Sequence, residues 1–474
     1  MKKIVKKSII LLICVSIICF CLTACAATVN QNEESCAKYT VNLKSEQSLK
    51  TFSGESTTDY THFGENTLTS ASFHLYANSY QKEGGMIAVN SVYVEDSLVA
   101  FSLTGDSNEI LRVSLKEELF PNESVSIKIN YSLTLPEKEG IFGISGDTVR
   151  LSAFYPVLCP IERGEWQESK VGKYGDYIFS ECADMEVALT LPSNVVVASS
   201  GKRVSTVESG ELSTHTYKAE KIRDFAFCLS QKYHTVSAVY GSTYISAYAF
   251  SEEEGEQVLS FAQKAFAKFS EKYGKYTHQT FSVALCEIDN AGMEYDGLVY
   301  IDRKLKGEEL EIVVVHETAH EWWYGAVGGN PTQYAWLDEG LAEHSVLEYV
   351  QKYYGIEKRE QMVSEREKAY SAFVNANKSI KGKGDIPLTQ NVDNFSSLYE
   401  YVTVTYTKGM LFFENLKSIC GEKKFNDGLK RYYKSFSKKI AKPEDLCECL
   451  SVSANKNLVP VFDAWEKGKV YFGT

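Results

Sequence analysis

Several hallmarks of specialised architectures are missing from this chain of 474 residues. It has no internal repeat, no collagen-like period and no heptad run, which excludes a solenoid, a fibrous protein or a long coiled coil. No CxxC pair occurs among its 12 cysteines, so nothing predicts a zinc ribbon or a redox pair, and the sequence assigns no disulfide. What remains is 44% hydrophobic and 24% charged, a globular composition whose length indicates two or three domains.

Positive charge is also scarce. Lys and Arg number 50 against 62 Asp and Glu, which gives a formal net charge of −12. Removal of the first 24 residues, which carry four lysines, would make the charge −16. An acidic surface argues against nucleic acid as a partner, and no obligate protein partner is evident.

The first 24 residues are expected to be a signal peptide. Four lysines precede the apolar run IILLICVSIICFC, and LTAC follows with Cys25 at its end. LTAC resembles a bacterial lipobox, which implies a lipid on Cys25, a flexible tether over 25–36 and anchoring to the outer face of a bacterial cell membrane. The alternative is an uncleaved membrane anchor, although the run is shorter than the ~20 residues that span a bilayer.

Residues 37–245 are expected to form a β domain. Apolar residues alternate with polar ones in 125–135 and again in 185–191, and turn residues separate such runs. This period of two predicts antiparallel sheets with one buried face, as in a β-sandwich or a saddle. After about residue 245 the period changes, so 246–474 is predicted to be a second, mainly α domain of an α+β protein. Its expected helices span 252–273, 308–324, 338–353, 355–378, 399–419, 423–437 and 443–453, with strands at 281–285 and 297–301 around a short turn.

The segment HETAH at 316–320 is the strongest chemical signal. On a helix, positions i and i+4 lie ~6 Å apart on one face, so His316 and His320 can approach one ion together. Glu317 projects about 100° away, where it can hold a water without binding the ion. The alternative is a buried helix with two histidines four residues apart, because the five-residue pattern alone is weak.

A catalytic zinc needs a third protein ligand, and WLDEG at 336–340 offers Glu339. Eighteen residues separate it from His320, enough for a loop and a return on a second helix. Alone, Glu339 would be an ordinary acid on a surface helix. At this distance from HETAH it is predicted to be the third ligand of a single Zn²⁺.

With HETAHEWWYG and WLDEG both in place, the sequence resembles the aminopeptidase N-like gluzincin metallopeptidases. GMEY (292–295) is similar to their exopeptidase motif, YTKG (406–409) to the segment with their catalytic tyrosine, and FDAWEKG (462–468) to the end of their catalytic domain. FYPVLCP (154–160) and DYIFSECADMEVALTLP (176–192) resemble the β domain of bacterial members. The resemblance implies a thermolysin-like catalytic domain and a zinc-dependent aminopeptidase.

Roles follow from the resemblance. Glu317 is expected to be the general base, and Tyr406 to stabilise the oxyanion. Glu294 is expected to bind the α-ammonium of the peptide substrate, and the backbone of Ala291, Gly292 and Met293 to pair with it as an edge strand.

The chain also departs from the family pattern. Glu321 stands where many members have Gln, and Tyr324-Gly325 replaces the common Gly-Asn. The P-T-Q and DEP-type motifs of longer relatives are absent, which leaves one contact to the substrate amine unassigned. The sequence also ends near the close of the catalytic domain, so a large C-terminal helical domain is not expected and the cleft should be more open.

Other residues keep two interpretations or a structural one. Glu343, four residues after Glu339, either orients a ligand histidine or is a solvated acid. His344 is expected to be structural, Trp322 and Trp323 to be packing residues, and the remaining histidines to have no special partner. Two other functions stay open: a zinc endopeptidase with an open cleft, and a lipid-anchored peptide-binding module with a degenerate peptidase domain.

Overall fold

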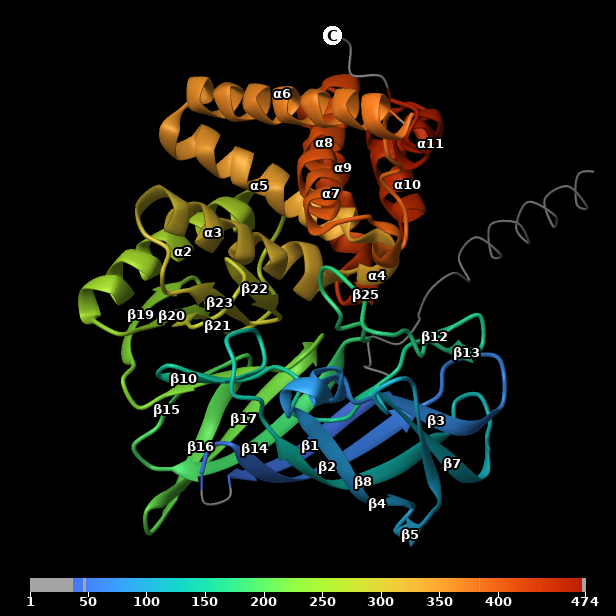
Figure 1. Cartoon of the computed structure of the whole chain (residues 1–474), viewed down its shortest axis with the longest axis vertical. Helices are drawn as coiled ribbons and strands as arrows, with labels where there is room; N and C mark the ends of the chain where they lie inside the picture. The colour runs from blue at the N-terminus through green and yellow to red at the C-terminus, as the bar shows by residue number, and fades with distance from the viewer. Residues whose placement is uncertain (1–36, 46–47, 383, 471–474) are drawn as a thin grey trace, which may run out of the picture. The chain divides into compact units, whose positions relative to one another are not determined.

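Alternating buried and exposed side chains build the first half of the chain, as the period of two predicts. The computed structural model describes residues 37–45, 48–382 and 384–470. In β8, Val125, Ile127 and Ile129 are buried while their neighbours are more exposed. This strand belongs to an eight-stranded sheet with the order β16-β17-β14-β1-β2-β8-β4-β5 (Figure 1). Its strands are β1 (Ala37–Ser45), β2 (Thr51–Thr61), β4 (Met86–Val94), β5 (Ser97–Leu98), β8 (Ser124–Thr134), β14 (Ala183–Pro192), β16 (Lys202–Ser209) and β17 (Leu212–Ile222).

Smaller sheets complete this β-rich half. They have the orders β15-β18-β10-β9, β11-β3-β7-β6 and β12-β13. One strand pair differs from the predicted antiparallel pattern, because β1 and β14 run parallel. The strands concerned are β3 (Leu68–His74), β6 (Phe101–Thr104), β7 (Ile110–Leu119), β9 (Gly143–Ser145), β10 (Thr148–Leu151), β11 (Val157–Leu158), β12 (Ile161–Glu162), β13 (Glu165–Trp166), β15 (Val196–Ser199) and β18 (Phe227–Ser230).

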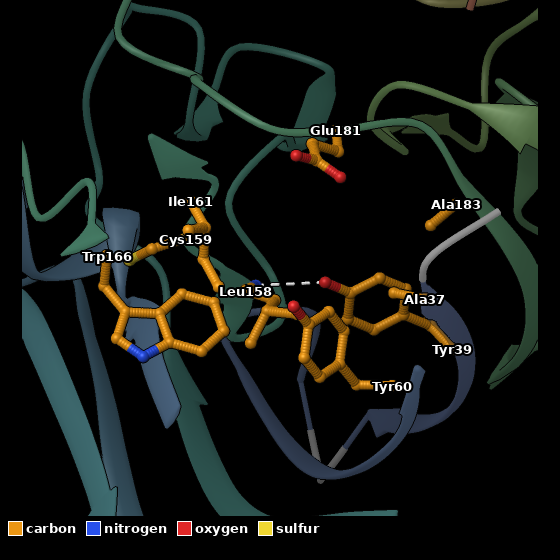
Figure 2. Close-up of a pocket in the computed structure, with 9 residues that line it drawn as sticks. All are labelled: Ala37, Tyr39, Tyr60, Leu158, Cys159, Ile161, Trp166, Glu181 and Ala183. Atoms are coloured by element: carbon orange, nitrogen blue, oxygen red, sulfur yellow. Dashed lines mark hydrogen bonds between the residues drawn. The ribbon is translucent and has the colours of Figure 1, made fainter. Parts of the chain in front are cut away.

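Figure 2 shows a shallow pocket in this half, where β1 begins. Tyr39, Tyr60 and Trp166 line it, and the Tyr39 hydroxyl accepts a hydrogen bond of 3.0 Å from the backbone N–H of Leu158. None of the predicted site residues lines this pocket.

A five-stranded sheet separates two hydrophobic cores. Its order is β19-β20-β21-β23-β22. On β21, Phe281 and Val283 pack into the core that contains the helices, whereas Ala284 and Cys286 pack into the core of the β-rich half. A strand buried on both faces reads as a continuous apolar run, which explains FSVALC. The strands are β19 (His234–Tyr240), β20 (Thr243–Ala249), β21 (Thr280–Cys286), β22 (Gly292–Tyr295) and β23 (Leu298–Asp302).

Helices dominate the rest of the chain, as predicted. Figure 1 shows α2 and α3 beside the five-stranded sheet and the later helices beyond them. The α+β class, a β-rich half followed by a helical half, is confirmed. The helices are α2 (Glu252–Lys272), α3 (Gly307–His320), α4 (Pro331–Tyr334), α5 (Trp336–Tyr354), α6 (Ile356–Lys381), α7 (Leu398–Val402), α8 (Gly409–Cys420), α9 (Glu422–Phe436), α10 (Pro443–Ala454) and α11 (Val459–Glu466), with π-helical turns η2 (Glu321–Ala326) and η4 (Thr403–Lys408).

The proposed division at residues 245/246 falls inside β20, which pairs with β19 before it and β21 after it. The predicted signal peptide, the tether and Cys25 lie outside the described residues. Within the described ranges, no helix combines the length and apolar character needed to cross a membrane.

Candidate metal centre

The three predicted metal ligands converge on one point. His316 and His320, one turn apart on α3, bring their Nε2 atoms to 3.1 Å from each other. An oxygen of Glu339 on α5 lies 3.1 Å from Nε2 of His316 and 3.4 Å from Nε2 of His320. The helical spacing therefore places two imidazoles and one carboxylate around a common centre, as the sequence predicts.

These residues fit a zinc ion. Two imidazole nitrogens and one carboxylate oxygen, all within 4.8 Å of one another, are the donor set of a catalytic zinc site with an open fourth position. His320 and Glu339 are buried, and His316 is nearly so. Two facing imidazole nitrogens in a buried site are held best by a cation between them.

Glu339 is matched electrostatically to its neighbours. Burial opposes ionisation of its carboxyl group, but the hydrogen bonds from His316 and His320 outweigh burial and lower its pKa to about 2. Burial lowers the pKa of His320. An ionised glutamate beside a neutral imidazole is the form in which both groups bind a metal.

Glu343 takes the orienting position rather than that of a solvated acid. Its Oε1 lies 3.1 Å from Nδ1 of His316, so it fixes the ring whose Nε2 faces the metal centre. Arg366 on α6 approaches the other Glu343 oxygen at 3.5 Å. Nδ1 of His320 makes no hydrogen bond to the described residues, and Oε1 of Glu294 lies 4.0 Å from it.

Glu317 lies beside the metal centre and faces the edge strand β22. Its side chain is 6% exposed, and its Oε2 has no hydrogen-bond partner in the described part of the chain. Burial raises its pKa to about 8. A Cβ atom on Gly292 would lie 2.2 Å from Oε1 of Glu317, so only glycine lets the strand approach this carboxylate so closely.

The sequence predicted that GMEY is part of a turn, but in the structure it forms the strand β22. It pairs antiparallel with β23 and forms one edge of the five-stranded sheet. The reason is that residues 292–295 pair with the next strand in a hairpin, whose tight turn at Asp296 and Gly297 gives Gly297 a φ of 84°. The carbonyl of Ala291 accepts a hydrogen bond from Asp302, and Met293 is buried against the β-rich half.

Asp176 joins the site from the β-rich half, and the sequence analysis missed it. It lies in the connection between β13 and β14, and its carboxylate clusters with those of Glu294 and Glu339 within 4.8 Å. Tyr174 anchors this connection by stacking on Tyr401, with ring centres 5.8 Å apart. No spacing rule links residue 176 to residue 294, so only its place in DYIFSEC could have drawn attention to it.

Asp176 and Glu294 form a pair of acids beside the metal centre, at the other end of the site from His316. Burial, followed by the charge of Glu339, raises the pKa of Asp176 to about 7. Burial and the neighbouring Asp176 raise the pKa of Glu294 as well. In the described part of the chain neither acid has a lysine or arginine within ion-pair distance. Among the described residues, this end therefore lacks the lysine or arginine that usually accompanies two neighbouring carboxyl groups.

Tyr406 is the tyrosine that reaches the metal centre. Its hydroxyl donates a 2.5 Å hydrogen bond to Oε1 of Glu339, and its ring stacks on His316 at 6.0 Å. Tyr401 is also buried nearby, with a hydroxyl that has no hydrogen-bond partner among the described residues. Tyr399 is 68% exposed, so of these three tyrosines Tyr406 is the one whose hydroxyl contacts Glu339.

A network of polar side chains connects the end of α3 to the β22–β23 hairpin. Glu321 accepts hydrogen bonds from the backbone N–H of Gly297 and from Tyr276, which ties the end of α3 to the β22–β23 hairpin. Asp296, in the same hairpin, binds His278 at 2.8 Å and Lys438 at 3.1 Å. The sequence suggested no partner for His278.

The residues expected to be structural are placed accordingly. His344 is fully buried and bonds to Glu414 at 2.8 Å, on the side of α5 away from the metal centre. Trp322 and Trp323 are 0% and 1% exposed within the helical core.

The chain is similar in sequence to known aminopeptidases. Residues 253–465 match the description "Peptidase family M1 domain". Human endoplasmic reticulum aminopeptidase 2 is 25% identical over 297 residues, which cover 57% of this chain and 30% of the relative. Aminopeptidase N of Lactobacillus delbrueckii subsp. lactis is 25% identical over 247 residues, covering 49% and 29%. The chain thus spans less than a third of the length of these two relatives.

Among solved structures, the M1 zinc metallopeptidase from Deinococcus radiodurans superimposes with a TM-score of 0.69 at 17% identity. The match covers 93% of this chain and 96% of that one. A mutant of the same protein, bound to a Tyr-Ser-Ala substrate, superimposes with a TM-score of 0.68 at 17% identity. Both halves of the fold, with their order along the chain, therefore recur in a known metallopeptidase.

Proposed function

We propose that this protein is a zinc-dependent aminopeptidase, which removes N-terminal residues from peptides, and the match of residues 253–465 to the peptidase family M1 domain supports this proposal. The observation that carries this proposal is the juxtaposition of two acidic groups with the metal centre. Asp176 and Glu294 lie beside Glu339 and have no lysine or arginine partner among the described residues. A substrate α-ammonium is the cation that would complete this end.

His316, His320 and Glu339 would hold the zinc, whose Lewis acidity acidifies water and polarises the scissile carbonyl. Glu317 acts as the general base. Its carboxylate, beside the metal centre and with one oxygen free of hydrogen bonds, takes a proton from the attacking water and delivers it to the leaving amine.

Tyr406 stabilises the negative charge that develops on the carbonyl oxygen. Its hydroxyl is already placed at the metal centre, where it donates to Glu339 before substrate arrives. Transfer of this hydrogen bond to the substrate oxygen would favour the transition state over the bound substrate.

Glu294 and Asp176 determine which end of the peptide enters. Each accepts a charge-assisted hydrogen bond from the substrate ammonium, so that the first peptide bond lies over Glu317. The backbone of residues 291–293, on the edge of the sheet, pairs with the substrate as an added strand. A peptide that continued past these two acids would cover them without supplying a cation, which disfavours endopeptidase activity.

Zinc content and hydrolysis of aminoacyl-anilides, measured together, test the proposal. We expect one zinc per chain, loss of hydrolysis on chelation and recovery when zinc is returned. Hydrolysis that resists complete zinc removal would exclude the metal mechanism. Binding of zinc and peptide without turnover would instead support the peptide-binding module.

We further propose that the mature protein is lipid-anchored through Cys25 at the outer face of a bacterial membrane. The LTAC sequence after a basic and apolar start supports this location. Cys25→Ser should release the protein from the membrane fraction, and an unchanged distribution would refute the anchor.

A further inference from the structure

The lysine of YTKG is buried and has no part in the mechanism above. Lys408 is 0% exposed, although a lysine is rarely buried unless it is paired. Its Nζ lies 2.9 Å from the carboxylate of Asp385, 2.5 Å from the carbonyl oxygen of Ile386 and 3.3 Å from that of Trp465. An ammonium has three donors, and here each has an acceptor.

Asp385 is equally well connected. Besides Lys408, its carboxylate accepts hydrogen bonds from the hydroxyl of Tyr370 at 2.5 Å and from the backbone N–H of Ile386 at 3.0 Å and Val470 at 3.2 Å. The ion pair therefore joins η4 to α6, to the connection after α6 and to the segment after α11. A pair with this many fixed partners holds one geometry.

The ion pair sits at the end of the turn that carries Tyr406. Thr403–Lys408 form the π-helical turn η4, in which Tyr406 lies two residues before Lys408. Such turns are wider than an α-helical turn, occur mostly as single turns and are frequent at functional sites. The side-chain direction at Tyr406 depends on this local geometry, so a tertiary anchor at the end of the turn has a direct effect on it.

A second contact sets the distance to the metal centre. A Cβ atom on Gly409 would lie 3.1 Å from Cα of Gly340, and one on Gly340 would lie 3.0 Å from the backbone of Gly409. Thus α5 and α8 touch backbone to backbone right after Glu339 and Lys408. This contact fixes the distance between α5 and α8. The position of Tyr406 relative to Glu339 then depends on the backbone conformation of η4.

We infer that Lys408, held by Asp385, is a positioning residue that keeps the Tyr406 hydroxyl at the metal centre during catalysis. The inference rests on the proposed role of Tyr406 as the oxyanion donor. Lys408 touches neither substrate nor metal ligands, and it acts only through the turn.

A double-mutant cycle tests this inference. Lys408→Met should lower kcat about 10²-fold and change KM little, because a misplaced donor is lost from the transition state and not from substrate binding. In a Tyr406→Phe background the same substitution should lower kcat less than about threefold, since the group it positions is already gone. Zinc content should equal that of the wild type in all variants.

Lys417→Met is the matched control. Lys417 also lies in an ion pair of low exposure, 2.7 Å from Glu348, on α8 but away from Tyr406. It should lower the thermal midpoint and leave kcat unchanged. If Lys408→Met fails to fold, Asp385→Asn serves the same cycle, because the amide preserves the shape while it removes the charge.

Two results would overturn the inference. If Lys408→Met and Asp385→Asn lower kcat by the same factor with and without the Tyr406 hydroxyl, the ion pair does not act through Tyr406, while the proposed function stands. If Tyr406→Phe alone leaves kcat at the wild-type value, Tyr406 is not the donor, and both its proposed role and the positioning inference fail.

Discussion

At one end of the candidate site Glu339 lies beside two histidines, whose hydrogen bonds lower its pKa to about 2 despite burial. At the other end Asp176 lies beside Glu294, and burial raises its pKa to about 7. The same chemical group thus has opposite protonation tendencies within one cluster of carboxylates. The metal end, formed by His316, His320 and Glu339, finds partners for its charge within the chain. The amine end, formed by Asp176 and Glu294, has no lysine or arginine partner among the described residues, and we propose that a substrate ammonium supplies the cation there.

The metal end should show the largest effect. Glu317→Gln should lower kcat about 10²- to 10⁴-fold, because the amide cannot accept the proton of water. Zinc content should stay at one per chain, since Glu317 is not among the ligands. Steady-state kinetics and metal analysis check both points, and wild-type turnover in this variant would remove the general-base role.

The amine end should show the next largest effect, confined to one substrate class. Glu294→Gln or Asp176→Asn should lower kcat/KM for free-amine substrates by about 10- to 10²-fold through loss of a charge-assisted hydrogen bond. Zinc content should not change. Asp289→Asn, an exposed acid just before β22, is the matched control and should behave as the wild type. Equal losses on acetylated substrates would show that the two acids do not recognise the amine.

Glu343→Gln should affect the metal end and leave the amine end unchanged. Its contact with Nδ1 of His316 orients a ligand, so the substitution should weaken zinc affinity by about 10- to 10²-fold. With saturating zinc, the preference for a free amine should be retained. Competition with a chromophoric chelator measures the affinity. An unaltered zinc affinity would show that Glu343 does not orient His316 for metal binding.

The smallest effect concerns stability and pH. Since the folded-state pKa of Asp176, about 7, lies above the ordinary value of 3.8 for an aspartate, the folded chain binds more protons than the unfolded chain between these pH values. The free energy of unfolding should therefore fall as pH rises through this window. In metal-free protein, Asp176→Asn should reduce that loss by roughly 1 kcal/mol or more, measured by urea unfolding at pH 4.5 and 7.5. Identical slopes for both proteins would contradict the raised pKa.

The metal end could be predicted from the sequence because its geometry is local. HETAH places two histidines on one helix, and the distance to WLDEG allows a second helix to return beside it. The same local logic predicted the long helices and the alternating strands, for which periodicity reports burial directly.

The amine end could be predicted only in part, because Asp176 and Glu294 are brought together by packing between the two halves of the fold. No period or spacing in the sequence encodes that contact. The parallel pair β1–β14 and the Lys408–Asp385 ion pair escaped prediction for the same reason, because each depends on a partner outside its own helix or strand. The β22 strand has a local partner, β23, and was missed because it is only four residues long.

The most direct test of this account compares two substrates that differ only in an N-terminal acetyl group. The wild-type protein should cleave a free aminoacyl-anilide with a kcat/KM at least about 10²-fold above that for the acetylated form. In Glu294→Gln the ratio should fall toward unity through loss of the free-amine rate. Equal or faster cleavage of the acetylated substrate by the wild type would contradict the claim that this cleft recognises a peptide amino terminus.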